Sequence, residues 1–494
     1  MTTFIVCVVY VIVIIAIGKI TGGKNKTAEK YYAAERSLNW PLIASMVLAM
    51  SFAGPAISGP VSTGYETGIA VIWAMWGMAI GILIATTTGV LDLYRCAGRH
   101  GGISVPSVFE YRLGKKSRTL MVICTAVVFV MHFTLQVSAV GLIFAGLTGW
   151  SYTSMAIFTA ACFVLMGWFG FKGVAWQGVL HNVVMYVGFG ILVVAGLRDA
   201  GGFTGLFESL GYDPYFNLWY PSFGVAFGEL MSAIIQVFVS ATVMQAVFLA
   251  KNRKEAKKGY GVGIVLGAIY ATFAPLIGMC AMAVMGPGKD SGTILTTFAS
   301  SYGLIFVIGA SLAVVAATSS TAPGLLMVSM SCIVNDLLPE MKKDITEKTK
   351  MKWTYALFII LGAFSVWLSI EFATALVNYL FLCFAISAQA GLVIAVAEKW
   401  GRVNDRSAFA SVLVGVVACF VWVFVGNEEI LSTFWFGTIL TCITLVTTTF
   451  IFGKGTDPKY LNYKEEQAWL KANADKEFDE YKEKLEQINK EADL

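Results

Sequence analysis

Residues 42–68 read LIASMVLAMSFAGPAISGPVSTGYETG, an apolar stretch long enough to cross a bilayer but interrupted near its middle. The interruption begins at Gly54-Pro55, and a second Gly-Pro pair follows within two turns. A proline inside a helix removes one hydrogen bond and displaces the carbonyl about four residues earlier, here near Ser51 and Phe52. We therefore expect a broken membrane helix whose freed carbonyls can bind a cation. The alternative is a proline kink that only shapes packing.

The composition of the whole chain places this stretch in a membrane protein. Of its 494 residues, 57% are hydrophobic and 13% are charged, and the mean hydropathy is +0.72. Soluble domains average roughly 25% charged residues, so the composition argues against a soluble enzyme and against a disordered chain. The nine cysteines include no CxxC pair, which argues against a zinc site. The predicted fold class is an all-α polytopic membrane protein.

Apolar runs bounded by charges, glycine and proline predict about thirteen transmembrane helices. The first run has no preceding Lys or Arg and no small-residue cleavage pattern after it, so we expect a retained helix rather than a signal peptide. The predicted spans are 3–20, 40–61, 69–93, 119–147, 154–173, 178–197, 225–249, 259–286, 304–338, 353–370, 372–397, 407–425 and 431–453.

The positive charges between these spans fall in alternate loops, as cytoplasmic loops require. With the N-terminus outside, the outside loops hold only Arg198 and Lys289 as cations. The inside loops hold Lys172 and the basic residues within 24–36, 95–118, 251–258, 342–352 and 399–406. We therefore predict a multi-pass protein of the plasma (inner) membrane, with the lipid bilayer as a partner, the N-terminus outside and the C-terminus cytoplasmic.

The charged tail, residues 454–494, contains eight Lys and eleven acidic residues. Apolar residues recur in it at spacings of three and four, which predicts an amphipathic helix. Such a helix is mostly solvated, docks on the cytoplasmic loops, or pairs with a second copy of the chain. The residues of this stripe are Leu470, Ala474, Phe478, Tyr481, Leu485, Ile488 and Ala492.

A second unusual stretch is LAVVAATSSTAPGLLMVSMS, residues 312–331, in the ninth predicted span. Four consecutive hydroxyl residues, 318–321, precede a Pro-Gly pair deep in an apolar helix. Hard cations prefer oxygen ligands, and two adjacent hydroxyls together with the carbonyl of Ala317 can supply three of them. The alternative is that these hydroxyls bond to their own helix or to a neighbouring one.

Away from the last three residues of each predicted span, the His, Asp, Glu, Lys and Arg side chains within the spans are His132, His181 and Glu229. Such residues are costly in a membrane and are functional candidates. His181 and Glu229 are candidate proton or coupling residues, and His132 or His181 is the candidate base of an intramembrane enzyme. The sequence contains no HExxH, GxSxG, Walker or GxGxxG context, so nothing in it indicates catalysis, an organic cofactor or a nucleic-acid partner.

Five segments resemble the sodium:solute symporter family, in that family's order along roughly residues 30–400. EKYYAAERSLNW resembles the entry into the family's first broken helix, and GYETG resembles its Gly-Tyr-x-x-Gly. SVPSVFEYRLGKKSR is similar to its Pro-x-x-x-x-x-Arg-x-Gly loop. QAVFLAKNRKEAKKGYGVG is similar to its Gln-Arg-x-Leu-Ala-x-Lys segment, and SMSCIVNDLL to the end of its sodium-binding helix. The segments start at residues 29, 64, 104, 245 and 329.

The resemblance implies a LeuT-like core of two inverted five-helix repeats, 40–197 and 225–397. An extra helix within 1–22 precedes this core, and two helices within 407–453 follow it. The resemblance also implies a sodium site between the first broken helix and the ninth span. By position, its ligands are the carbonyls of Ala49, Phe52 and Ala317 and the hydroxyls of Ser320 and Thr321.

The sequence departs from the family pattern at three places. Gly178 stands where the family often has an aspartate, which puts a second cation site in doubt and makes His181 a possible substitute. The family's Gln-Arg is Gln245-Ala246. The Glu-Gln of its sugar transporters is Pro55-Ala56, which disfavours a sugar as the solute.

We therefore expect a sodium-coupled symporter that imports a small organic solute by alternating access: an amino acid, a monocarboxylate or a vitamin-like acid. The only metal expected is the co-transported Na+. Candidate solute-binding residues are Ser51, Gly54, Ser58 and Ser240. A proton-coupled or uncoupled transporter on the same scaffold is the nearest alternative. More remote are the intramembrane enzyme and a membrane sensor whose output is the charged tail.

Overall fold

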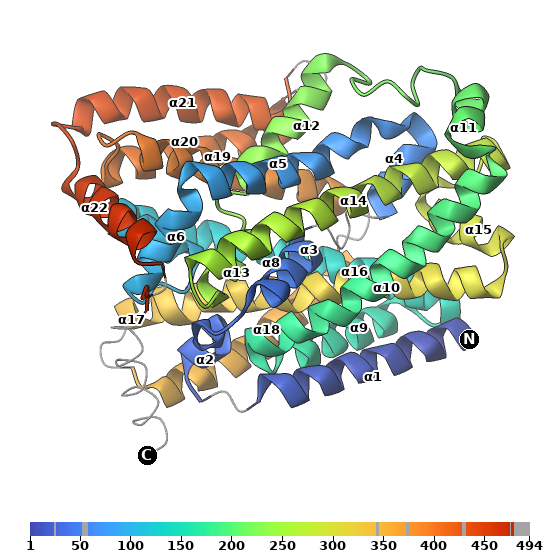
Figure 1. Cartoon of the computed structure of the whole chain (residues 1–494), viewed down its shortest axis with the longest axis horizontal. Helices are drawn as coiled ribbons and strands as arrows, with labels where there is room; N and C mark the ends of the chain where they lie inside the picture. Colours follow the sequence, from blue (N-terminus) through green and yellow to red (C-terminus); the bar gives the residue numbers. More distant parts are fainter. Residues whose placement is uncertain are drawn as a thin grey trace.

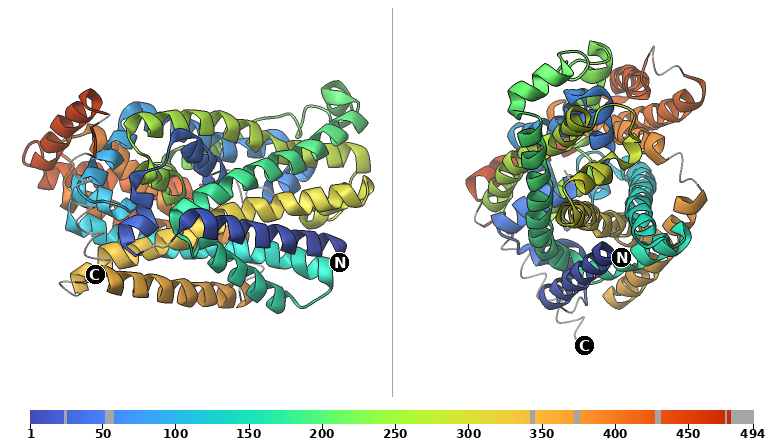
Figure 2. Two further views of the ribbon diagram at one scale, coloured as in Figure 1. Left: turned by 60° about the horizontal axis from the view of Figure 1, so that its bottom comes forward. Right: turned by 90° about the vertical axis from the view of Figure 1, so that its right-hand side faces the viewer.

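The computed structural model describes residues 1–23, 26–51, 58–341, 345–371, 376–426, 431–474 and 476–478. These residues form helices joined by short loops, and an isolated bridge between Leu38 and Ala250 is their only β-type pairing. The long helices run side by side along the molecule (Figure 1), and Figure 2 shows them from the side and end-on as one bundle.

The first half of the chain contains a leading long helix, a broken helix and two long helices that cross the whole bundle. Its elements are α1 (Thr2–Gly22), α2 (Ala28–Ala33), η1 (Ala34–Arg36), α3 (Trp40–Ser51), α4 (Ser58–Thr67), η2 (Ile69–Val71), α5 (Ile72–Thr88), α6 (Val90–Arg99), α7 (Val105–Arg112), α8 (Lys115–Thr148), α9 (Tyr152–Gly167) and α10 (Gly170–Asp199).

The second half continues from α11 (Gly202–Leu210) with α12 (Phe223–Gln236), α13 (Ala241–Leu249), α14 (Arg253–Met285), η3 (Ser291–Thr293), α15 (Ile294–Ser301) and α16 (Leu304–Ser331). A π-helical turn, η4 (Cys332–Leu337), extends α16 into α17 (Leu338–Met341). The remaining helices are α18 (Glu347–Glu371), α19 (Leu376–Lys399), α20 (Asp405–Val425), α21 (Thr433–Phe452) and α22 (Pro458–Ala472).

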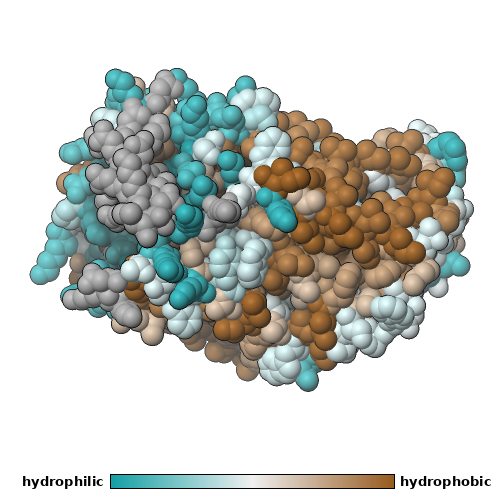
Figure 3. All heavy atoms as spheres, turned by 90° about the horizontal axis from the view of Figure 1, so that it is seen from below, coloured by the Kyte–Doolittle hydropathy of each residue, from teal (hydrophilic) through white to brown (hydrophobic). Residues whose placement is uncertain are grey.

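Eleven helices in the described part of the chain are long and apolar enough to cross a membrane. Two shorter apolar helices, α3 and α9, coincide with two further predicted spans. Figure 3 shows a broad hydrophobic surface next to a polar end, the distribution expected of a protein embedded in a bilayer. The all-α membrane fold is confirmed, whereas the count of thirteen spans stays a prediction.

The interruption predicted in the second span lies in the residues between the end of α3 and the start of α4. Residues 52–57 lie outside the described part of the chain, so the predicted ligand Phe52 and the solute candidate Gly54 lie outside it as well. The two described halves behave as separate packing elements, since α4 packs chiefly on α14 while α3 also contacts α10, α13 and α16.

The seventh predicted span is found as Phe223–Leu249 but contains a break, and one predicted loop is misplaced. The seventh span is not continuous: α12 ends at Gln236 and α13 begins at Ala241, so four residues break it near its middle. The loop predicted at 174–177 lies instead at 168–169, where Gly170 adopts a left-handed φ of +78° and starts α10. Lys172 therefore belongs to the first turn of a helix rather than to a loop.

The charged tail is packed on the bundle. Helix α22 contacts α6 and α7 at the end of the molecule opposite the N-terminus, here called the tail end (Figure 1). Leu470, Glu477 and Phe478 are all buried. The predicted amphipathic helix is only partly correct, because α22 ends at Ala472 and the described residues beyond it form turns. The stripe from Tyr481 onward lies outside the described residues.

One tail contact predicts a pH dependence. His100, at the end of α6, lies 2.9 Å from the carboxylate of Glu466 in α22, and this hydrogen bond raises the pKa of His100. The contact therefore stabilises docking fully below the ordinary histidine pKa of about 6.5, and its contribution is lost as pH rises through the higher folded value. We expect hydrogen exchange in α22 to accelerate across this window beyond the intrinsic pH effect. A His100→Gln variant should abolish that excess, and an unchanged excess would contradict the assignment.

Candidate functional site

Four oxygen atoms from α3 and α16 converge inside the bundle. The Ser320 hydroxyl lies 3.0 Å from the Ala49 carbonyl and 2.7 Å from that of Ala317. The Thr321 hydroxyl lies 3.0 Å and 3.3 Å from the same two carbonyls. All four residues are buried, with at most 4% of their surface exposed. The structure thus brings together four of the five residues predicted as sodium ligands, while Phe52 lies outside the described part.

Close packing of α16 on α3 holds this cluster together. Gly324 faces α3, and a Cβ atom there would lie 2.2 Å from the terminal methyl group of Met50. Pro323 lies inside α16 and has no backbone N–H. The Ser319 carbonyl therefore lacks the hydrogen bond that it would normally accept within the helix. The Pro-Gly pair therefore permits the close approach on which the oxygen cluster depends.

The donor set of the cluster consists of neutral oxygens. Hydroxyl and carbonyl oxygens suit a hard cation, and the absence of a carboxylate from this set favours a single positive charge over a divalent ion. Across the described residues, no group of three or more His, Cys, Asp and Glu could hold a metal ion. The arrangement can therefore exchange its internal hydrogen bonds for a monovalent cation.

The solute candidates lie at the two helix breaks. Ser51 ends α3, is buried, and its hydroxyl has no hydrogen-bond partner among the described residues. Ser58 begins α4, but its side chain lies outside the described part. Ser240 is buried at the start of α13, and its hydroxyl lies 2.8 Å from that of Thr242. Helix α13 packs against α3, so Ser51 and Ser240 lie at ends of two helices that contact each other.

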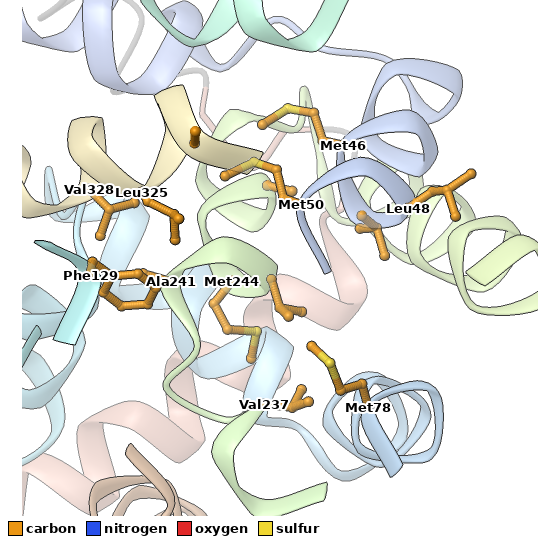
Figure 4. Close-up of a cluster of buried hydrophobic side chains, with 14 of the residues drawn as sticks. Met46, Leu48, Met50, Met78, Phe129, Val237, Ala241, Met244, Leu325 and Val328 are labelled. Carbon is orange, nitrogen blue, oxygen red and sulfur yellow. The ribbon is translucent and has the colours of Figure 1, made fainter. Parts of the chain in front are cut away.

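A cluster of buried apolar side chains includes residues of α3 and residues next to the second break. Figure 4 shows a buried cluster with Met46, Leu48 and Met50 on α3, Val237 and Ala241 on either side of the second break, and Met244 and Met78 near Val237. Phe129, Leu325 and Val328 complete the labelled set. Methionine side chains are flexible and polarisable, so they adapt readily to small apolar groups.

The candidate proton residues lie elsewhere. His181 is buried on α10, and its Nδ1 atom lies 2.5 Å from the hydroxyl of Tyr10 on α1, while its Nε2 atom has no hydrogen-bond partner in the described chain. Glu229 lies on α12, where its side chain is half-buried. His132 contacts the rings of Phe129 and Phe384. None of these three side chains hydrogen-bonds to the oxygen cluster within the described residues.

Sequence reasoning assigned no site role to two polar residues here, Asn182 and Thr242. Asn182 donates to the carbonyl and the hydroxyl of Ser45, 3.1 and 3.0 Å away, and so ties α10 to α3 one turn before Ala49. Gly178 lies one turn earlier in α10, where a Cβ would meet the Ser45 hydroxyl at 3.1 Å. Thr242 is the second of these polar residues, and its hydroxyl pairs with that of Ser240. The local sequence does not predict the Asn182–Ser45 and Thr242–Ser240 pairs. The first joins two helices that are distant in the sequence, and the second depends on the break before α13.

The comparison with known families agrees with this geometry. The sequence matches the sodium:solute symporter family over residues 31–415. The chain belongs to the sodium:solute symporter family. Curated relatives in this family include the high-affinity proline transporter PutP of Bacillus subtilis, 22% identical over 84% of this chain and 91% of its own length. The sodium/proline symporter of Escherichia coli is 23% identical, with coverages of 87% and 90%. A monocarboxylic acid transporter of Corynebacterium glutamicum is 22% identical, with coverages of 86% and 84%.

Solved structures show the same fold. The substrate-bound outward-open state of a Na+-coupled sialic acid symporter superposes with a TM-score of 0.82 at 18% identity, covering 92% of this chain and 98% of that one. MhsT in complex with L-phenylalanine superposes with a TM-score of 0.55 at 16% identity, with coverages of 83% and 98%. This symporter therefore has a LeuT-like fold, and its relatives are named as transporters rather than enzymes.

Proposed function

We propose that this symporter uses the inward sodium gradient to import a small organic solute by alternating access. The observation that carries the proposal is the oxygen cluster, in which two hydroxyls of α16 meet the Ala49 carbonyl beside the break in α3. Sodium bound by Ala49, Phe52, Ala317, Ser320 and Thr321 would tie α3 to α16. An ion that binds one state better than another shifts the population toward it, so sodium would favour the substrate-ready state.

We propose an amino acid, a monocarboxylate or a vitamin-like acid as the solute, held by Ser51, Gly54, Ser58 and Ser240. Three of the relatives are named for proline or monocarboxylic acid transport, which supports a carboxylate-bearing solute. The methionine-rich cluster beside the breaks suits a solute with an apolar body better than a sugar with many hydroxyls. The first amides of α13 offer positive dipole ends to a carboxylate.

We further propose that the tail end faces the cytoplasm of a cell whose plasma membrane holds the protein. Its loops carry most of the Lys and Arg residues, and the N-terminus lies at the opposite end (Figure 1). Residues 40–197 and 225–397 would form the two inverted repeats. The breaks α3/α4 and α12/α13 support this division, because each lies near the start of one repeat. Self-association through the tail is disfavoured by its docking on its own chain.

Uptake into liposomes tests the proposal. Purified protein should accumulate radiolabelled L-proline or pyruvate, but not D-glucose, when sodium is high outside, and potassium should not replace sodium. Accumulation driven by an imposed pH gradient without sodium would instead support proton coupling. In that case His181→Gln and Glu229→Gln would identify the titrating group. Equal uptake of all three solutes would contradict the proposed solute class.

A further inference from the structure

At the tail end of the bundle, the backbone just before α3 pairs directly with the end of α13. The amide of Leu38, just before α3, donates to the Leu249 carbonyl at 3.0 Å, and the Lys251 amide donates to the Leu38 carbonyl at 2.9 Å. Leu249 ends α13, so this bridge joins the tail-end halves of the two helices that carry the candidate site. Separation of α3 from α13 at this end would break both hydrogen bonds.

Arg95 of α6 secures the α13 side of this bridge. One of its terminal nitrogens donates to the carbonyls of Val247 and Ala250, at 2.6 and 2.8 Å. These carbonyls lie at the C-terminal end of α13, where a cation is favourable. The guanidinium is completely buried, so it needs a counter-charge.

The tail supplies that counter-charge. One oxygen of Glu477 lies 2.6 Å from Nε of Arg95, and neither side chain has any exposed surface. The other oxygen accepts a hydrogen bond of 2.8 Å from the amide of Arg253, at the first residue of α14. One carboxylate thus joins the start of α14 to Arg95 of α6, which in turn binds the end of α13.

The next residue reaches the α3 side. The ring of Phe478 lies under the guanidinium groups of Arg36 and Arg95, 4.9 and 4.6 Å from the ring centroid. Arg36 precedes Leu38 by two residues and also pairs with Glu29 at 2.9 Å. Phe478 therefore contacts an arginine next to each side of the bridge: Arg36 beside Leu38, and Arg95, which binds the end of α13.

Helix α22 anchors this end piece to the bundle. Arg99 pairs with Glu466 at 2.8 Å and lies over the ring of Trp469 at 3.9 Å. The buried Tyr463 donates to the Gly89 carbonyl at 3.1 Å, and Lys464 pairs with Glu398 at 2.9 Å. These contacts span α6, the turn before it and the end of α19, so they hold the tail in register.

We propose that residues 458–474 and 476–478 form a strap that holds α3 and α13 together at the tail end, and that opening toward this end requires Glu477 and Phe478 to detach. Detachment leaves Arg95 buried without its carboxylate, which makes opening costly. The strap therefore favours the state that is closed at the tail end and opposes release of cargo there. Its role in transport rests on the proposed alternating access, but its effect on the bridge needs neither sodium nor solute.

Hydrogen exchange measured by mass spectrometry tests the strap in sodium-free buffer without solute. We compare the full chain, a Glu477→Gln variant, a chain ending at Asn473 and a matched control chain ending at Glu480. The chain that ends at Asn473 lacks Glu477 and Phe478, whereas the control chain that ends at Glu480 keeps both. Peptides containing Leu38 and Lys251 report the bridge. A peptide containing Ile69, whose amide donates to the Tyr215 carbonyl at 2.9 Å, reports a contact away from the tail end.

The strap predicts about tenfold faster exchange of the Leu38 and Lys251 peptides in Glu477→Gln and in the chain ending at Asn473. The Ile69 peptide and the control truncation should match the full chain. Unchanged exchange at the bridge would overturn the proposal. Equal acceleration at Leu38 and Ile69 would also overturn it, because that pattern indicates general destabilisation. If the truncated chain does not fold, Glu477→Gln alone decides. If the exchange results match the strap prediction but the full chain shows no sodium-driven uptake, the result would instead count against the proposed function.

Discussion

The double variant Ser320→Ala/Thr321→Ala should lose sodium-dependent uptake. Both hydroxyls lie within 3.3 Å of the Ala49 and Ala317 carbonyls in a buried cluster, so their removal takes two oxygens from the proposed ion site. At about 1–2 kcal/mol for each hydroxyl, the apparent sodium affinity should fall roughly 30- to 1,000-fold. The measurement is a sodium titration of the initial uptake rate at fixed solute concentration.

Ser319→Ala is the matched control for this experiment. Ser319 is equally buried on the same turn of α16, and its hydroxyl has no hydrogen-bond partner among the described residues. Its replacement should leave the sodium titration within about twofold of wild type, since it removes no oxygen from the cluster. Equal losses in Ser319→Ala and in the double variant would contradict the assigned ligands, as would an unchanged titration in the double variant.

Gly278→Ala should strongly destabilise the protein. A Cβ atom at this position would lie 2.2 Å from the Val61 carbonyl oxygen and 2.5 Å from the Tyr65 amide nitrogen. These are backbone atoms of α4, so α4 and α14 would have to separate. Such overpacking costs about 1–3 kcal/mol, and more where backbone must move. We expect a lower thermal midpoint and weaker transport, because α4 follows the break at the proposed site.

Gly261→Ala is the comparison within the same helix. Nothing lies within 4 Å of a Cβ at Gly261, and alanine is favoured over glycine in a helix by about 1 kcal/mol. Thermal unfolding of the two variants in detergent should therefore move in opposite directions, or at least differ by several degrees. Similar midpoints for both would show that the close contact of α4 with α14 does not limit stability.

The two broken helices show what a sequence reveals about such folds. Gly54-Pro55 predicts the first interruption, because proline cannot continue the hydrogen-bond ladder, and both residues lie outside the described part of the chain. The second break, between Gln236 and Ala241, contains neither glycine nor proline. It is stabilised from outside the segment: the carbonyl of Phe238 accepts a hydrogen bond of 2.8 Å from the hydroxyl of Tyr94 on α6. A partner 144 positions away leaves no local signal.

The candidate site was predictable in part. The hydroxyl run before Pro323 indicated Ser320 and Thr321, but their partner Ala49 came from the family resemblance. Helix packing decides which turn of α3 faces α16, and an all-apolar stripe does not encode that choice. His181 shows the same limit. As a lone polar group in a span it was a fair functional candidate, and the structure gives it a partner, Tyr10, on the leading helix.

The tail was the least predictable part of the chain. Its excess of charge suggested a mostly solvated helix, yet Glu477 is fully buried. The reason is long-range pairing, because Arg95 lies 382 residues earlier in the sequence. A carboxylate can be buried when such a partner neutralises it, and composition alone does not reveal the partner.

The central claim is that this symporter binds sodium between α3 and α16. Its most direct test is the thermal stability of the purified wild-type protein in sodium compared with potassium at equal ionic strength. A ligand that binds only the folded state stabilises it by about 2.7 kcal/mol at a concentration 100 times its Kd. We predict a higher unfolding temperature in sodium that disappears in Ser320→Ala/Thr321→Ala. Identical unfolding temperatures in sodium and potassium for the folded wild type would contradict the claim.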